Sequence, residues 1–136
     1  MRAHLLKLIF NGTAIANIAD DAGTSPLTNL YVSLHTADPG ETGNQTTNEC
    51  AYTSYARVAV ARTSGGWTVT ANSVSPTANI DFPAAIGGTE TATHMAVGTA
   101  ASGTGKILYY GAITPNISIS TGVIPRIGTG STITED

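Results

Sequence analysis

The fold class is decided by the stretch Leu30-Tyr31-Val32-Ser33-Leu34-His35. Leucine and valine alternate there with residues that tolerate solvent, and alternation with a period of two is typical of a half-buried β-strand. On this pattern we expect His35 on the polar side of its strand, hydrogen-bonded to loop backbone. Similar stretches recur at a spacing of roughly ten residues, separated by turns rich in Gly, Ser, Thr and Asn. They predict further strands at residues 55–62, 67–70, 80–82, 93–97, 106–112, 117–120 and 127–133.

Short strands at this spacing are typical of packed or closed antiparallel sheets. Gly65-Gly66 predicts a hairpin that joins residues 55–62 to residues 67–70. We therefore expect an all-β fold, an antiparallel β-sandwich of jelly-roll type with a short N-terminal α-helix. The length of 136 residues predicts a single domain, 1–136, with a sizeable core.

The N-terminal helix is expected within residues 1–12. Leu5, Leu8 and Ile9 follow the helical spacing i, i+3, i+4, with Leu6 and Phe10 beside them. Asn11-Gly12 then predicts the end of the helix, and a loop is expected at residues 20–26. Because the apolar residues cover more than one stripe, the helix needs wide burial. We expect it to plug one end of the sandwich; the alternative is that it docks on another subunit.

The charge of the chain excludes several classes of protein. Charged residues make up 11% of it, and the formal net charge is −3 with six Lys and Arg. A general binder of nucleic acid needs a clustered basic face, so that class is excluded. The longest apolar stretch, residues 5–10, is far shorter than the ~20 residues of a membrane span and does not resemble a signal peptide. We expect a soluble protein made in a reducing cytoplasm, with no nucleic-acid partner and no membrane partner.

Residues that could support metal or cofactor chemistry are sparse. His35 and Asp38 form a two-ligand fragment without the further ligands that a metal site needs. Asp38 and Glu41 lie in a loop whose spacing fails the calcium-binding pattern. Cys50, the single cysteine, has no neighbouring cation to activate its thiol. We interpret it as a small core residue, with a nucleophile or a dimer link as the alternatives, and expect no cofactor and no metal.

Motifs of catalysis are also missing from the sequence. It contains no G-x-S-x-G nucleophile elbow and no phosphate-binding glycine loop. A hydrolase of polysaccharides would need two carboxylates, such as Asp38 and Glu41, ~5–9 Å apart in a cleft. That activity is kept as a third alternative, and the expectation is that the protein is not an enzyme.

The polar loop at residues 37–49 and the tyrosines are the candidate binding features. The loop is longer than a usual connection, and such loops tend to be functional or mobile. Neighbours on a strand face opposite sides, so at most one of Tyr109 and Tyr110 lies in the core. For these residues and for Tyr52 with Tyr55, core packing, a protein interface and stacking on a sugar remain as alternatives.

Several stretches together resemble small virion proteins of tailed bacteriophages. The most specific combination is residues 30–40, then Tyr52, then residues 55–60. The helix break at residues 10–13 and the apolar stretches at 95–98 and 107–111 agree with it, so the resemblance covers most of the chain. Its relatives are variously labelled tail-fibre-like, minor structural or capsid-associated. The resemblance implies a structural protein of the virion and brings no catalytic residues with it.

Within that class, the short chain without an internal repeat favours a capsid decoration or cement protein over a long repetitive fibre. We expect it on the capsid exterior, where it would bridge major capsid subunits and stabilise the head through many modest contacts. The alternative is a tail or fibre-associated module that binds host surface glycans. The expected partners are the major capsid protein, other copies of this chain, or both. An edge strand that needs protection favours a homo-oligomer, a dimer or a trimer.

The expected interface residues lie on the N-terminal helix, in the long loop and among the tyrosines. They are Leu5, Leu6, Ile9, Phe10, Asp38, Glu41, Tyr52, Tyr55 and Tyr109. The C-terminal residues 134–136 are a further candidate.

Overall fold

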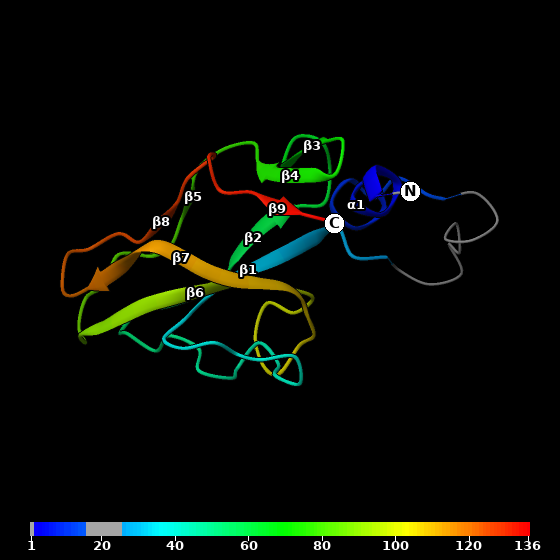
Figure 1. Cartoon of the computed structure of the whole chain (residues 1–136). Coiled ribbons are helices and arrows are strands. Elements are labelled where there is room, and N and C mark those ends of the chain that lie inside the picture. Colours follow the sequence, from blue (N-terminus) through cyan, green and yellow to red (C-terminus); the bar gives the residue numbers. More distant parts are fainter. Residues whose placement is uncertain (1, 16–25) are drawn as a thin grey trace. The chain divides into compact units, whose positions relative to one another are not determined.

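The computed structural model describes residues 2–15 and 26–136, so the expected loop at residues 20–26 lies almost wholly outside the described residues. Its elements in chain order are α1 (Arg2–Asn11), β1 (Asn29–His35), β2 (Val58–Ala61), β3 (Trp67–Thr70), β4 (Ser73–Pro76), β5 (Ile80–Asp81), β6 (Glu90–Gly98), β7 (Ile107–Ile119), β8 (Arg126–Ile127) and β9 (Ile133–Thr134) (Figure 1). The all-β fold class with antiparallel sheets and one short N-terminal helix is confirmed, and it is consistent with a β-sandwich.

The chain divides into two compact units. Unit 1 comprises Met1–Leu30, Val60–Ile80 and Ile127–Asp136, and unit 2 comprises Tyr31–Ala59 and Asp81–Arg126. A single domain over residues 1–136 stays a prediction.

In unit 1, α1 packs against the three-stranded sheet β3-β4-β9 (Figure 1). Leu6 and Phe10, one helical turn apart, are fully buried, and the ring of Phe10 meets that of Trp67 edge-on at 4.8 Å. Leu5 stays 37% exposed, so the apolar surface of the helix is buried less widely than expected. No helix in the described part of the chain is long and apolar enough to cross a membrane.

The C-terminus of α1 is closed by an arginine from a distant part of the chain. Arg62 donates from Nε to the Ile9 carbonyl at 2.7 Å and from a terminal nitrogen to the Leu8 carbonyl. Carbonyls in the last turn of a helix have no partner within it, so the guanidinium supplies the missing donors. The backbone turns away at Gly12, whose φ of 65° is easy for glycine, as the Asn11-Gly12 signal predicted.

The hairpin expected at Gly65-Gly66, which paired residues 55–62 with residues 67–70, is wrong. β3 pairs with β4, in the register Trp67↔Pro76 and Val69↔Val74, whereas β2 neighbours β1. The glycines lie in a turn in which the amides of Gly66 and Trp67 both donate to the Thr63 carbonyl at 3.0 Å. A Cβ on Gly66 would lie 2.1 Å from the Ala61 carbonyl oxygen. β4 was not predicted because Ser73–Pro76 has one apolar side chain besides its proline.

The long sheet has the order β2-β1-β6-β7. Its central pairing, β1 with β6, is antiparallel and places Val32 opposite Val97 and His35 opposite His94. Ser33 and His35 are fully buried, as are Val32 and Leu34. The expectation of a solvent-facing polar side for His35 is therefore wrong, because β1 is covered on both faces.

β7 corrects another prediction, since the strands expected at 106–112 and 117–120 form one element. Its register against β6 jumps from His94↔Ala112 to Ala92↔Ile117, so residues 113–116 bulge out between two paired arms. Figure 1 shows β7 running alongside β6.

The remaining differences lie in strand length: β6 is longer than the predicted 93–97, and others are shorter. Residues 55–57 lie outside β2, and the strand expected at 127–133 is divided into β8 and β9. Gly128 and Gly130 lie in the interval between β8 and β9, where the chain turns.

Candidate functional site

The loop of residues 37–49 is folded on itself by short-range hydrogen bonds. The Asp38 carboxylate accepts from the Gly40 amide at 2.7 Å, and the Asn44 side-chain oxygen accepts from the Thr46 amide at 2.9 Å. Asn48 donates from Nδ2 to the Asp38 carbonyl at 3.1 Å, which ties the end of the loop to its start. Asp and Asn close turns in this way because their short side chains reach the backbone two residues on.

Gln45 anchors the middle of this loop in the interior of unit 2. Its side chain is fully buried, its backbone amide donates to the Thr104 carbonyl at 2.9 Å, and its Oε1 accepts from the Ala100 amide at 2.9 Å. The side chain passes between two glycines: a Cβ on Gly98 would lie 2.2 Å from Gln45 Cδ, and one on Gly105 would lie 1.9 Å from Oε1. The two glycines therefore leave the space that the Gln45 side chain occupies.

The loop ends at a buried ion pair. Arg57 binds both oxygens of Glu49, Nε to Oε1 at 2.7 Å and a terminal nitrogen to Oε2 at 2.8 Å. Its other donors reach the carbonyls of Ala100 at 2.9 Å and Gly103 at 2.6 Å. Tyr55 donates its hydroxyl to Glu49 Oε1 at 2.8 Å. This network joins the 37–49 loop to the turn at residues 100–103.

The charges in this network reinforce one another. Its hydrogen bond to Glu49 raises the pKa of Arg57 above the ordinary value, so the guanidinium stays charged. Burial raises the pKa of the Tyr55 phenol, and the Glu49 carboxylate raises it further, so this hydroxyl remains a donor. The same hydroxyl accepts from the Leu34 amide at 3.1 Å. Arg57 and Tyr55 thus hold backbone groups, and the Glu49 carboxylate holds these two side chains in place.

His35 connects β1 to the same loop. Its Nδ1 lies 2.8 Å from the Thr47 carbonyl, which confirms the expected hydrogen bond to loop backbone, and its Nε2 lies 2.9 Å from the Ser33 hydroxyl. Burial lowers the pKa of His35 below its ordinary value of 6.5. No group of three or more His, Cys, Asp and Glu able to hold a metal ion occurs among residues 2–15 and 26–136.

The tyrosines divide into internal and surface groups. Tyr52 is only 4% exposed and donates its hydroxyl to the Pro83 carbonyl at 2.8 Å; its ring meets that of Tyr55 edge-on at 5.4 Å. Tyr55 in turn stacks on Phe82 at 6.3 Å. A sugar has no access to a ring as buried as Tyr52, so Tyr52 belongs to the core, whereas Tyr55 is half-buried. By contrast, Tyr110 reaches the exposed Glu41 with a hydrogen bond of 2.9 Å, and Tyr109 is half-buried.

Cys50 lies beside this aromatic group and is 3% exposed. Burial raises the pKa of its thiol to about 12, and the neighbouring carboxylate of Glu90 acts in the same direction. Glu90 itself accepts from the amides of Ala51 and Tyr52, both at 2.8 Å. The burial of Cys50 agrees with its interpretation as a small core residue.

The other interface candidates lie on α1. Leu6 and Phe10 belong to the core, whereas Ile9 is half-buried and Leu5 is exposed. In this conformation Leu6, Phe10 and Tyr52 position surface residues and do not reach the surface themselves. Among the nine candidates, those with substantial exposed area are Leu5, Asp38 and Glu41.

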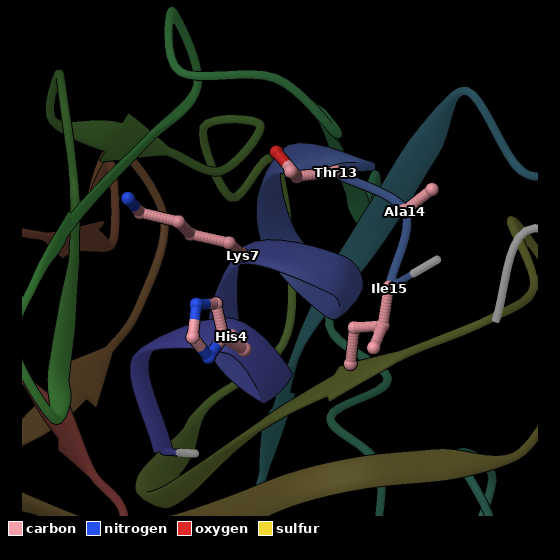
Figure 2. Close-up of a pocket in the computed structure, with 5 residues that line it drawn as sticks. All are labelled: His4, Lys7, Thr13, Ala14 and Ile15. Atoms are coloured by element: carbon pink, nitrogen blue, oxygen red, sulfur yellow. The ribbon is translucent and has the colours of Figure 1, made fainter. Parts of the chain in front are cut away.

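Two hollows lie beside α1. Figure 2 shows the first, of about 260 Å³, with His4 and Lys7 on one side in this view and Ala14 and Ile15 on the other. The second, of about 450 Å³, shares Lys7 and Thr13 with it and is further lined by Asn11, Ser64, Trp67, Thr68 and Val69. The titratable side chains in these linings are His4 in the first hollow and Lys7 in both.

Sequence reasoning missed the residues that build the loop support: Gln45, Glu49, Arg57 and Glu90. Arg57, a charge next to the apolar residues 58–60, was the one available signal. Glu90 is far along the chain from the amides that it binds, and no local pattern predicts such a pairing.

Comparison with known families adds an independent finding. A family described as podophage GP4 fiber I protein gp80 matches residues 1–135, and the chain belongs to this family. A search of curated proteins finds no match. Membership makes the chain a structural protein of a bacteriophage virion, as the resemblance in its sequence implied, and it points to a non-enzymatic role.

Proposed function

We propose that the chain is a structural subunit of the phage fibre, which acts through protein–protein contacts and not through catalysis. The observation that carries this proposal is the family match, because it extends over residues 1–135 of the 136 and the family is described as a fiber protein. The finer choice between fibre and capsid is thus drawn from the family's description.

The arrangement of polar groups in unit 2 supports a structural role. Glu49 accepts from Arg57 and Tyr55, and Glu90 accepts from two backbone amides. Catalytic acids and nucleophiles need a free position for substrate and a pKa suited to proton transfer or attack. These groups instead hold loops in place, and the thiol of Cys50 is kept protonated.

The contact surface that we propose is the exposed side of the 37–49 loop. Asp38 and Glu41 are exposed there, while Gln45 and Glu49 hold the loop from beneath. A loop that is ordered before binding loses less conformational entropy on association than a flexible one. The loop therefore suits repeated contact with a fixed neighbour in the virion.

Quantitative mass spectrometry of purified virions tests the proposal, with the major capsid protein as internal reference. A fibre subunit is expected at a few copies per particle, as a small multiple of the number of fibres. A ratio close to the copy number of the major capsid protein would contradict the fibre proposal. It would favour the capsid decoration role, which the short chain without an internal repeat supports.

Incorporation of variants tests the contact surface separately. We expect Asp38→Asn together with Glu41→Gln, which remove the charges but keep the oxygens that accept from the Gly40 amide and the Tyr110 hydroxyl, to lower the number of copies per virion without lowering the Tm of the isolated chain. Asp81→Asn, which removes an exposed carboxylate elsewhere in unit 2, is the matched control. Full incorporation of the double variant would exclude this face of the loop as the contact.

A further inference from the structure

β7 forms one end of the long sheet and has one neighbour in it. It pairs with β6, and no other strand in the described part of the chain pairs with its second side. At thirteen residues it is also the longest strand described, whereas β2, at the other end of the sheet order, has four. An edge of this length presents a row of backbone donors and acceptors that can pair with another strand.

Native proteins usually protect such an edge with a bulge, a proline or a charge. In β7 the bulge at residues 113–116 contains Pro115 and protects the middle of the strand. The arm at residues 107–112 has no proline and no charge. Its register against β6 shifts once, at Leu108, between Gly98↔Ile107 and Val97↔Tyr109, so residues 109–112 are its regular part. It is paired with β6 through five register positions between Gly98↔Ile107 and His94↔Ala112, and its sequence is Ile-Leu-Tyr-Tyr-Gly-Ala.

The side chains of this arm also suit an interface. No charged residue occurs between Ile107 and Ile119. Residues 107–111 are all half-buried, although neighbours on a strand point to opposite faces. Both faces of the arm therefore retain exposed apolar and aromatic area.

We propose that a second copy of this chain pairs with the β7 arm, residues 107–112 of one copy running antiparallel to the same residues of the other about a two-fold axis. Identical edges are self-complementary in this arrangement, because the two-fold axis repeats every hydrogen bond that the first copy donates to the second as one that the second donates to the first. An uncharged arm brings no like charges together, which is the usual obstacle when a strand meets its own copy. The inference rests on the sheet edge and does not depend on the fibre assignment.

Gly111 allows a sharp test, because a Cβ added there meets no atom within 4 Å in the single chain. Gly111→Lys therefore places a charge on the edge without a clash within the subunit. Gly111→Thr adds a neutral side chain that suits a strand. Gly130→Lys adds the same charge outside β7, at a glycine with equally open surroundings.

The full-length chain and the three variants are compared by sedimentation velocity over a range of concentrations, with circular dichroism and Tm as checks of folding. We expect about twice the chain mass of 13.8 kDa for the wild type, Gly111→Thr and Gly130→Lys, and the mass of one chain for Gly111→Lys. A wild type that stays monomeric at every concentration overturns the proposal. So does a folded Gly111→Lys variant that keeps the mass of the wild type.

Hydrogen exchange of the wild type keeps the proposal testable if Gly111→Lys fails to fold. The amides of residues 107–112 that face away from β6 are expected to become protected as the protein concentration rises. Exchange at the rate of exposed loop amides at all concentrations overturns the proposal.

Discussion

Arg57 uses its guanidinium to bind the Glu49 carboxylate and two backbone carbonyls, with its side chain 3% exposed and that of Glu49 14% exposed. Removing one member of a buried pair leaves the other charged and without a partner, which is more damaging than the loss of one hydrogen bond. At the scale of the single residue, we therefore expect substitutions in this pair to be strongly destabilising.

We predict that Arg57→Met lowers the free energy of unfolding by about 3–5 kcal/mol. Urea denaturation of the wild type and the variant measures the change. Asp81→Asn is the control, since it breaks an exposed ion pair with Arg126. The side chain of Arg126 is 57% exposed and that of Asp81 is 44% exposed. That substitution is expected to leave stability within experimental error. Equal effects of the two substitutions would contradict the importance of burial.

His35 predicts how stability depends on pH. Its folded pKa lies below the ordinary value of 6.5, so the unfolded chain binds a proton at a higher pH than the folded chain does. The contribution of neutral His35 is therefore complete above pH 6.5 and is lost as the pH falls from there through the folded pKa. Three nearby groups act electrostatically on the His35 ring. Glu49 favours the charged form of His35, whereas Arg57 and His94 disfavour it.

The measurement is the free energy of unfolding between pH 7 and pH 5, for the wild type and for His35→Gln. We expect the wild type to lose stability toward pH 5 and the variant to show a smaller slope. An identical slope in the two proteins would show that another group controls the dependence.

At this scale the sequence predicted only part of the site. The hydrogen bond from His35 to loop backbone followed from a polar residue at a strand end next to a long loop. Its full burial did not follow, because the alternation in residues 30–35 cannot show that a second layer covers the polar side. The pairing of Glu49 with Arg57 depends on how the loop folds back, and no periodic pattern encodes that path.

At the scale of the element, α1 depends on a side chain from outside the helix. Arg62 binds the carbonyls of Leu8 and Ile9, and it also donates to the Leu27 carbonyl at 3.3 Å. A lysine keeps the charge but lacks the planar fork that reaches several acceptors at once. The helix of ten residues is too short to be stable in water alone, so its ends are expected to be sensitive.

We predict that Arg62→Lys lowers the free energy of unfolding by about 1.5–3 kcal/mol, the range for hydrogen bonds that involve a charged group. The amides in the last turn of α1 are expected to exchange faster. Lys106→Ala, an exposed substitution, serves as the control. Unchanged exchange in α1 of the Arg62 variant would show that the cap contributes nothing.

The packing of the Gln45 side chain between Gly98 and Gly105 can be tested by combining substitutions at Gln45 and Gly98. Gly98→Ala places a methyl group 2.2 Å from Gln45 Cδ, and overpacking of this kind costs about 1–3 kcal/mol. Gln45→Ala in the same chain is expected to recover part of that loss, because it removes the atoms that clash. A double-mutant cycle from denaturation curves measures the coupling, and additive effects would contradict the packing.

Element boundaries show where local sequence signals end. The N-terminal helix, β1 and most of β6 follow from periodicity and turn residues. The merging of two predicted strands into β7 does not, because Pro115 and the polar residues around it have the composition of a turn. β4 was not predicted because its single valine produces no periodic pattern.

At the scale of the whole molecule, the low charge distinguishes this chain. Only 11% of its residues are charged, and the β7 arm proposed to join two copies has none. Salt screens contacts between charges and leaves apolar and backbone contacts largely unaffected. We predict that the sedimentation coefficient stays constant between low and high salt. Dissociation on adding salt would show that charged residues outside β7 hold the copies together.

Composition and spacing were sufficient for the fold class, and the combination of residues 30–40 with residues 52–60 was sufficient for a virion protein. They did not distinguish fibre from capsid. That distinction depends on which neighbour the surface contacts, and the sequence of this chain does not contain that neighbour.

The single cysteine has a practical consequence. Cys50 is buried, and its pKa of about 12 keeps the thiol protonated at neutral pH. Air oxidation and maleimide reagents attack the exposed thiolate, so the native chain remains unlabelled. A cysteine introduced at an open surface position, such as Gly130→Cys, would then be the one reactive thiol, and a fluorophore attached there would report where the subunit lies on an intact particle.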